Sequence, residues 1–338
     1  MLKTRTVKLK PHISAKFPAA NVSWEVLESS KTSEADAFRI MDKALDMGIN
    51  FFDTANIYGD PAGATETIIG KWFAQDKSKR DKVVLASKVY NRMHQDEGNP
   101  NCNPGISKYK VKKHLADTLS RLQTDHLDLY QIHHVDRHIQ PDEFFEIFEA
   151  IKNEGKTLYL GTSNFPGWVL AKLQTEAKYR GSLGIVSEQT QYNLLNRIPE
   201  LEVLPACEAL GIGLFPYMPL AGGLLTGKIK TLDNTRSREL EGEYNINVGT
   251  NAKLAEFSKL CGELGEKENV VATAWVLSHP VVSSAIVGIR TLQHLDDLEA
   301  TVNLILPQDF IDKLNALFDV NDGRRLKNNL PSPEAYAW

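Results

Sequence analysis

The sequence predicts a closed α/β barrel of eight parallel strands, with its active site at the C-terminal rim of the strands. Short runs rich in β-branched or aromatic residues alternate with amphipathic helical patterns, which is typical of a parallel sheet covered by helices. No Gly-x-Gly-x-x-Gly pattern follows an early strand, which argues against a doubly wound open sheet. The length of 338 residues suits one barrel, whose usual size is about 250 residues plus insertions.

Seven strands can be read from the sequence, and each is paired with a helix. The first clear helix has Ser33 as its expected N-cap and Gly48 at its end, Ser107 is the expected cap of a later helix, and Pro141 sits where proline opens a helix. The expected strands cover residues 50–52, 83–86, 127–132, 158–161, 184–187, 212–215 and 284–287. The expected helices lie near 34–47, 64–73, 108–122, 141–154, 168–177 and 201–210, with two before residue 284, one from 292 and one over 308–318.

Closure of the barrel requires an eighth strand before residue 33. Residues 13–17 and 22–26 are both candidates, because Pro11 and Pro18 leave the register open. The absence of a linker or a break in composition predicts a single domain over 1–338, with an atypical segment at 1–32 and a helix and tail at 307–338.

The bulk properties exclude several classes of protein. A net charge of −4 without a basic block argues against a nucleic-acid partner. The cysteines, Cys102, Cys207 and Cys261, form no Cys-x-x-Cys pair, so we expect no disulfide framework, no metal site and a reducing compartment. With no secretory signal and no apolar run of about 18 residues, we expect a cytoplasmic protein without membrane spans.

Polar side chains follow every predicted strand at its C-terminal end, where barrel active sites are built. Asp53 and Tyr58 follow the first clear strand, Lys88 the second and His133 the third. The later strands are followed by Ser163 and Asn164, Glu188 and Gln189, Tyr217, and finally Gly288 and Arg290. We read His134 as structural or peripheral.

Five stretches of sequence resemble the aldo-keto reductase family in the correct order, each at a strand end. They are 50–59 (NFFDTANIYG), 127–133 (LDLYQIH), 161–165 (GTSNF), 191–194 (QYNL) and 216–228 (PYMPLAGGLLTGK). The resemblance covers roughly residues 34 to 300. It implies that Tyr58 is the general acid, that Lys88 and Asp53 tune it, and that His133 orients the carbonyl.

This assignment agrees with the needs of carbonyl reduction. The reaction requires a hydride donor, a proton donor and a group that holds the carbonyl oxygen as negative charge develops. A tyrosine is a weak acid with a reference pKa of about 10, and a nearby ammonium lowers that pKa. Lys88 is placed to act on Tyr58, Asp53 would keep the lysine charged, and His133 can donate a hydrogen bond.

The resemblance also implies a nicotinamide cofactor on the rim. Ser163, Asn164 and Gln189 resemble the residues that hold the carboxamide, and Tyr217 resembles the aromatic that stacks on the ring. Arg290 suits the adenosine 2′-phosphate, because guanidinium matches phosphate geometry, and it favours NADP(H) over NAD(H). The other expected cofactor contacts are Met218, Leu220, Gly222 and Lys228 in the pyrophosphate loop, Arg238 in the long loop, and Gly288, His294 and Asp297 near the adenosine.

The sequence departs from the family pattern at three places. No Gly-Thr element ends the first strand, and Trp24 or Lys16 could occupy its space. Leu298 replaces a common asparagine, so we expect one adenine contact to be lost, and Met218 replaces a common serine. The 90–104 loop, which includes Met93, His94, Asp96, Glu97 and Cys102, is expected to line the substrate entrance, and Tyr336 and Trp338 could cover the pocket.

The leading hypothesis is NADPH-dependent, reversible reduction of a small-molecule aldehyde or ketone to an alcohol. An alternative is a cofactor-binding regulatory subunit with slow turnover, similar to the potassium-channel β-subunit branch; the short N-terminal segment disfavours it. A third is a barrel isomerase or lyase with Lys88 as a Schiff-base amine, which leaves Tyr217 and Arg290 without a role. The substrate and the oligomeric state stay open.

Overall fold

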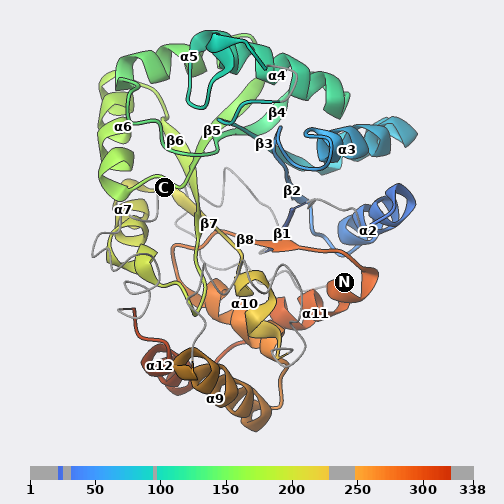
Figure 1. The fold of residues 1–338 in the computed structure, drawn as a ribbon, viewed down its shortest axis with the longest axis vertical. Helices are drawn as coiled ribbons and strands as arrows, with labels where there is room; N and C mark the ends of the chain where they lie inside the picture. The colour runs from blue at the N-terminus through green and yellow to red at the C-terminus, as the bar shows by residue number, and fades with distance from the viewer. Residues whose placement is uncertain (1–21, 26–31, 94–96, 228–247, 321–338) are drawn as a thin grey trace.

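The computed structural model describes residues 22–25, 32–93, 97–227 and 248–320. Its parallel strands form a closed barrel in sequence order, and β1 closes it by pairing with both β2 and β8 (Figure 1). The strands are β1 (Val22–Glu25), β2 (Phe51–Asp53), β3 (Val84–Val89), β4 (Leu127–Ile132), β5 (Thr157–Ser163), β6 (Ile185–Gln191), β7 (Gly213–Tyr217) and β8 (Ala285–Gly288). The predicted barrel is therefore confirmed.

Helices surround the barrel and alternate with the strands (Figure 1). They are α2 (Glu34–Asp46), α3 (Ala64–Gln75), α4 (Lys108–Leu122), α5 (Pro141–Asn153), α6 (Gly167–Tyr179), α7 (Val203–Leu210), α9 (Val248–Leu264), α10 (Glu268–Ser278), α11 (Leu292–Asn303) and α12 (Gln308–Leu317). Short 3-10 helices are η1 (Lys77–Lys82), η3 (Pro100–Cys102), η4 (Ile198–Leu201) and η5 (Ala221–Thr226). No helix in these described ranges is both long and apolar enough to span a membrane.

Local signals fix where several helices begin. The Ser33 hydroxyl accepts a hydrogen bond from the Asp36 backbone N–H (3.1 Å) at the start of α2, and Ser107 caps α4 in the same way. Pro141 opens α5 as predicted. Met47 is the C-cap of α2, and Gly48 follows it with φ +82°, a conformation that glycine tolerates.

The structure selects one of the two candidates for the first strand and corrects the start of one predicted helix. Of the two candidates for the first strand, the structure selects 22–25; residues 13–17, Lys16 among them, lie outside the described residues. The helix predicted from residue 201 starts at Val203, because residues 198–201 around Pro199 form η4.

The strands separate two hydrophobic cores. Phe51, Ala86, Leu129, Phe215 and Ile286 belong to the small core inside the barrel, whereas their alternate neighbours pack against the helices. Because side chains alternate along a strand, the residue two positions after an inward apolar residue also points inward, nearer the C-terminal rim.

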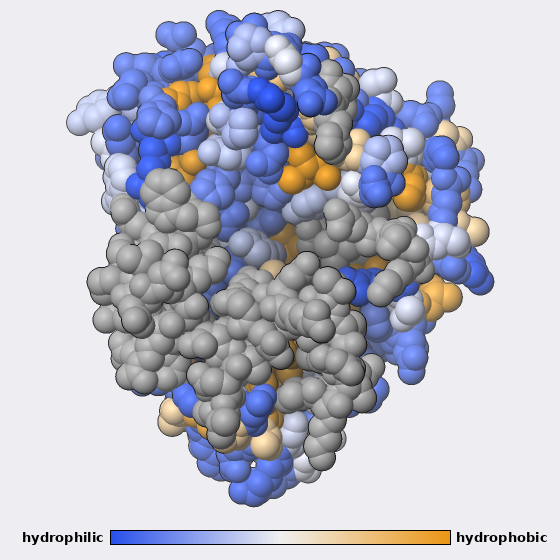
Figure 2. All heavy atoms as spheres, viewed as in Figure 1, coloured by the Kyte–Doolittle hydropathy of each residue, from blue (hydrophilic) through white to orange (hydrophobic). Residues whose placement is uncertain are grey.

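Outside the grey atoms, hydrophilic residues cover most of the face in Figure 2, and apolar residues appear there in small separate groups.

Candidate active site

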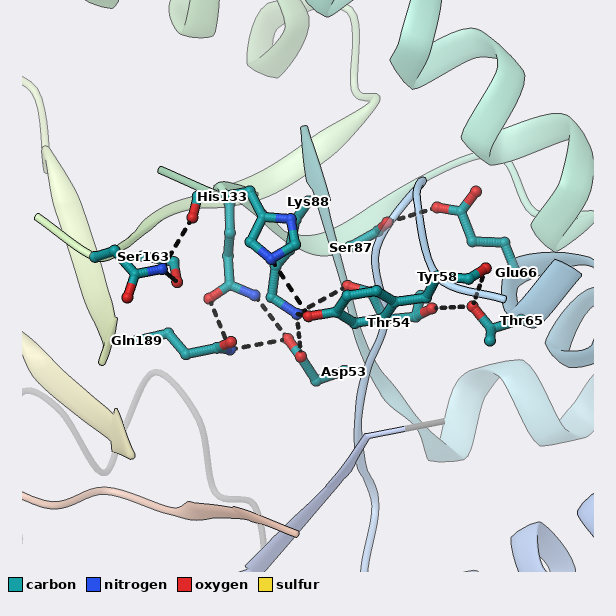
Figure 3. A network of polar contacts seen from close by, with 12 residues as sticks. Asp53, Thr54, Tyr58, Thr65, Glu66, Ser87, Lys88, His133, Ser163 and Gln189 are labelled. Carbon is teal, nitrogen blue, oxygen red and sulfur yellow. Dashed lines mark hydrogen bonds and ion pairs between the residues drawn. The ribbon is translucent and has the colours of Figure 1, made fainter. Parts of the chain in front are cut away.

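A buried ion pair lies at the centre of the rim. Asp53 follows inward-facing Phe51 on β2, Lys88 follows inward-facing Ala86 on β3, and both side chains are 0% exposed. The Lys88 ammonium contacts Asp53 Oδ2 and donates to the Thr54 carbonyl oxygen at 3.1 Å (Figure 3). Burying two charges is costly unless they are paired and hydrogen-bonded, as they are here.

Two buried amides complete the environment of the Asp53 carboxylate. Gln131 Nε2 donates to Asp53 Oδ1 at 2.7 Å, and Gln189 Nε2 donates to the same oxygen at 3.2 Å. The carboxylate therefore accepts from three donors on three different strands. The two amides hold Oδ1, and Oδ2 is left to face Lys88.

Tyr58 lies on the loop that follows β2 and points back toward this pair (Figure 3). Its hydroxyl is 3.2 Å from Lys88 Nζ, which lies 4.7 Å from the centre of the tyrosine ring. The loop is held by Asn56, whose backbone N–H donates to the Lys88 carbonyl and whose Nδ2 lies 3.0 Å from Nδ1 of His114 on α4. These contacts of Asn56 fix the loop, and the loop holds the Tyr58 hydroxyl beside the Lys88 ammonium.

His133 follows β4 and faces the same hydroxyl. Its Nε2 is 3.3 Å from the Tyr58 hydroxyl, and the two rings meet edge to face with centroids 5.5 Å apart. Burial, followed by the Lys88 ammonium and by His134, holds the pKa of His133 well below its usual range. The imidazole is therefore neutral near pH 7 and can donate one ring N–H.

The residues expected at the nicotinamide join this cluster. Asn164, which has a left-handed φ of +59°, donates from Nδ2 to the His133 carbonyl at 3.2 Å and to Ser163 Oγ at 3.1 Å. Its Oδ1 accepts from the Tyr217 hydroxyl at 2.9 Å. One connected set of polar contacts thus links Asp53, Tyr58, Lys88, His133, Ser163, Asn164, Gln189 and Tyr217.

The remaining predicted cofactor residues lie on neighbouring loops. Met218 and Gly222 take left-handed φ values of +54° and +67° after β7, and Leu220 is the N-cap residue of η5. Gly288 ends β8 in register with Glu25. The Arg290 backbone N–H is 3.3 Å from His294 Nδ1 at the start of α11.

Asp297, on the next turn of α11, is tied to the preceding helix. It accepts from Lys267 Nζ at 2.7 Å and from Asn269 Nδ2 at 2.8 Å. Leu298 is only 7% exposed and packs in the outer core. Lys228 and Arg238, like Tyr336 and Trp338, lie outside the described residues.

Two residues of the loop expected at the substrate entrance are buried. Met93 and Cys102 are 2% and 0% exposed. Buried Lys110 of α4 donates to the Asn103 carbonyl at 2.7 Å and contacts the Tyr90 carbonyl, so both ends of this loop are tied to α4. The half-buried rings of Tyr90 and His134 pair at 5.3 Å, whereas His94 and Asp96 lie outside the described residues.

Gln131 is the site residue that the sequence reasoning missed. It precedes His133 by two positions in β4, so alternation alone would have placed both side chains inside the barrel. A buried polar residue there needs a partner, and Asp53 is the acceptor within reach.

Comparison with known proteins identifies the family of this chain. The model of the aldo/keto reductase family matches residues 22–319. The uncharacterized oxidoreductase YrpG of Bacillus subtilis is 49% identical over 310 residues, covering 91% of this chain and 92% of the relative. A putative aryl-alcohol dehydrogenase of Schizosaccharomyces pombe is 32% identical (86% and 94% covered), and norsolorinic acid reductase B of Dothistroma septosporum is 30% identical (86% and 74% covered).

The fold and the site define a barrel oxidoreductase. The chain belongs to the aldo/keto reductase family.

Proposed function

We propose that this protein uses NADP(H) to interconvert an aldehyde or ketone and the corresponding alcohol. One observation carries the proposal: the Tyr58 hydroxyl lies 3.2 Å from the Lys88 ammonium and 3.3 Å from the His133 imidazole at the C-terminal ends of the barrel strands. A phenol between a cation and a neutral imidazole is suited to give a proton to a carbonyl oxygen that the imidazole helps to orient.

Each of the four residues has a separate task in this proposal. Tyr58 donates the proton, and the Lys88 ammonium favours the phenolate that remains. Asp53 holds Lys88 charged and in place. His133, neutral because of its lowered pKa, donates a hydrogen bond to the carbonyl oxygen as negative charge grows on it. In the oxidation direction the same phenolate accepts the alcohol proton.

The residues on the rim fit a nicotinamide dinucleotide, which supplies or accepts the hydride when it is bound. The side chains of Ser163, Asn164 and Gln189 offer the donors and acceptors that an amide requires, and Tyr217 offers a ring face beside them. Arg290 offers a guanidinium for a 2′-phosphate, which is why we propose NADP(H) rather than NAD(H). Met218, Leu220, Gly222, Lys228, Arg238, Gly288, His294 and Asp297 complete the proposed cofactor contacts.

The relatives suggest where to look for a substrate. Two of them are named for aryl-alcohol oxidation and for reduction of norsolorinic acid. Tyr90 follows Lys88 by two residues and His134 directly follows His133, and their paired rings offer an aromatic surface. We therefore place aromatic aldehydes and ketones first among the candidate substrates.

The test is fluorescence titration with NADPH and NADH, followed by NADPH oxidation with a panel of aromatic and aliphatic carbonyls. We expect tighter binding of NADPH and turnover of at least one carbonyl. Tight NADPH binding without turnover of any carbonyl would favour the regulatory alternative, and no binding of either dinucleotide would contradict the proposal.

A further inference from the structure

A second carboxyl, that of Glu188, lies next to the proposed cofactor residues but on the other face of β6. Gln189 points into the barrel and reaches Asp53, so its neighbour Glu188 points outward between the sheet and the helices, where it is 0% exposed. Cys207 of α7 lies in the same layer, and burial followed by the nearby Glu188 carboxyl raises the pKa of its thiol. A carboxyl that is buried in this way is costly unless hydrogen-bond partners satisfy its oxygens.

The partners of Glu188 flank the turn that carries Ser163 and Asn164. Thr162 Oγ1 lies 2.5 Å from Glu188 Oε2, and the Phe165 backbone N–H donates to Glu188 Oε1 at 3.0 Å. The Asn164 backbone N–H in turn donates to the Gln189 carbonyl at 2.9 Å. Two consecutive residues of β6, Glu188 and Gln189, therefore both hydrogen-bond to the turn that contains left-handed Asn164.

A neutral Glu188 carboxyl is consistent with the hydrogen bonds around it. Thr162 has a single hydroxyl proton, yet its Oγ1 lies near both Glu188 Oε2 and the Ser187 carbonyl (3.3 Å). If Glu188 is protonated, it donates to Thr162 Oγ1, and Thr162 donates to the Ser187 carbonyl. Glu188 Oε1 still accepts from Phe165, so every donor has an acceptor. The raised pKa of Glu188, about 8 because of burial, agrees with this arrangement.

We propose that Glu188 is a positioning residue for the cofactor: its buried carboxyl holds the 162–165 turn so that Ser163 and Asn164 face the nicotinamide carboxamide. The inference depends on the proposed function, because it concerns the same cofactor site. Glu188 itself does not reach the rim, so it acts through the shape of the turn and not by contact with the reacting atoms.

The test compares two substitutions of one side chain. Glu188→Gln keeps an acceptor for Phe165 and a donor for Thr162, whereas Glu188→Leu keeps the bulk and loses both hydrogen bonds. We expect the NADPH dissociation constant to rise about tenfold in Glu188→Leu and to stay within about twofold of the parent in Glu188→Gln. The KM for the carbonyl should change less than the affinity for NADPH.

Cys207→Ala provides the matched control, because it opens a gap beside Glu188 without removing either hydrogen bond. It should lower Tm and leave NADPH affinity unchanged. Equal NADPH affinity in folded Glu188→Leu and the parent would overturn the inference. So would a loss of NADPH affinity in Cys207→Ala as large as that in Glu188→Leu, because it would assign the effect to packing alone.

A second measurement reads the turn directly. Hydrogen exchange of a peptide covering residues 163–166 should speed up in cofactor-free Glu188→Leu, and in Thr162→Val if the leucine variant does not fold. Unchanged exchange in a folded variant would contradict the inference. This readout needs no cofactor, so it tests the inference even if the parent protein binds no NADPH. Absence of NADPH binding by the parent would contradict the proposed function instead.

Discussion

The Lys88–Asp53 pair contributes both to the proposed chemistry of the site and to the stability of the folded protein. Both side chains are fully buried, and the carboxylate is held by Gln131 and Gln189 as well as by the lysine. Replacing a buried pair can be tolerated, but removing one member leaves an uncompensated charge. The pair should therefore behave as a unit when it is mutated.

Lys88→Met should lower the free energy of unfolding by about 3–5 kcal/mol, because Asp53 stays buried without its cation. Adding Asp53→Asn should recover about 0.5–3 kcal/mol of that loss while activity stays low. Urea unfolding of the parent, both single variants and the double variant measures this. Additive losses in the double variant would show that the two groups do not depend on each other.

Glu188 predicts a dependence of stability on pH. Its folded pKa is raised from 4.5 to about 8, so its contribution to stability is fully present below pH 4.5 and is lost as pH rises through about 8. Cys207 is the titratable neighbour on α7, and its own raised pKa keeps the thiol neutral over this range.

Glu188→Gln should therefore become more stable than the parent as pH rises. The difference in unfolding free energy should grow between pH 4.5 and about 8, by up to about 1.4 kcal/mol per pH unit, and level off above. Urea unfolding at several pH values checks it. Parallel stability curves would mean that the Glu188 carboxyl is ionised in the folded protein.

At the scale of elements, helices α3 and α4 approach closely because Gly70 has no side chain. A Cβ at Gly70 would lie 2.1 Å from the Arg121 carbonyl oxygen, a backbone atom that cannot swing away. Nearby, Arg121 Nε donates to buried Glu66 at 2.7 Å, which joins the same two helices. The close contact and the ion pair together set the position of α3, which follows the Tyr58 loop.

Gly70→Ala should destabilise the protein by about 1–3 kcal/mol, because the two helices must separate. Gly262→Ala at an exposed position of α9 is the control: nothing lies within 4 Å of the added Cβ, and the gain in helix propensity should stabilise by up to about 1 kcal/mol. Thermal unfolding of both variants measures the difference. Equal Tm values would show that the α3–α4 contact relaxes freely.

Elements with local signals could be predicted from the sequence, and elements defined by distant pairing could not. Ser33, Ser107 and Pro141 mark helix starts through contacts within one turn. β1 has four residues and is defined by its neighbours β2 and β8, so the sequence left two candidates for it. The sequence predicts a helix from residue 201, two residues before α7 begins, because helical periodicity does not separate the end of η4 from α7.

At the scale of the molecule, barrel closure is what assembles the site. Asp53 and Gln189 are 136 positions apart in sequence, yet their side chains meet because each ends an inward-facing row of its strand. The rule that polar residues gather at strand ends predicted which residues to examine. It named Glu188 at a strand end but not the outward direction of its side chain, and it passed over Gln131, which lies within β4. The burial of Met93 depends on packing between distant segments, which the rule does not describe. The prediction of a single domain over residues 1–338 stays a prediction.

The central claim is that Tyr58 supplies the proton for carbonyl reduction, and Tyr58→Phe in a single-turnover experiment tests it most directly. The ring and its contacts with Lys88 and His133 remain, and only the hydroxyl is lost. With NADPH bound, NADPH absorbance after mixing with a carbonyl that the parent reduces should fall about 10²–10⁴-fold more slowly, at unchanged NADPH affinity. A rate equal to that of the parent would contradict the account.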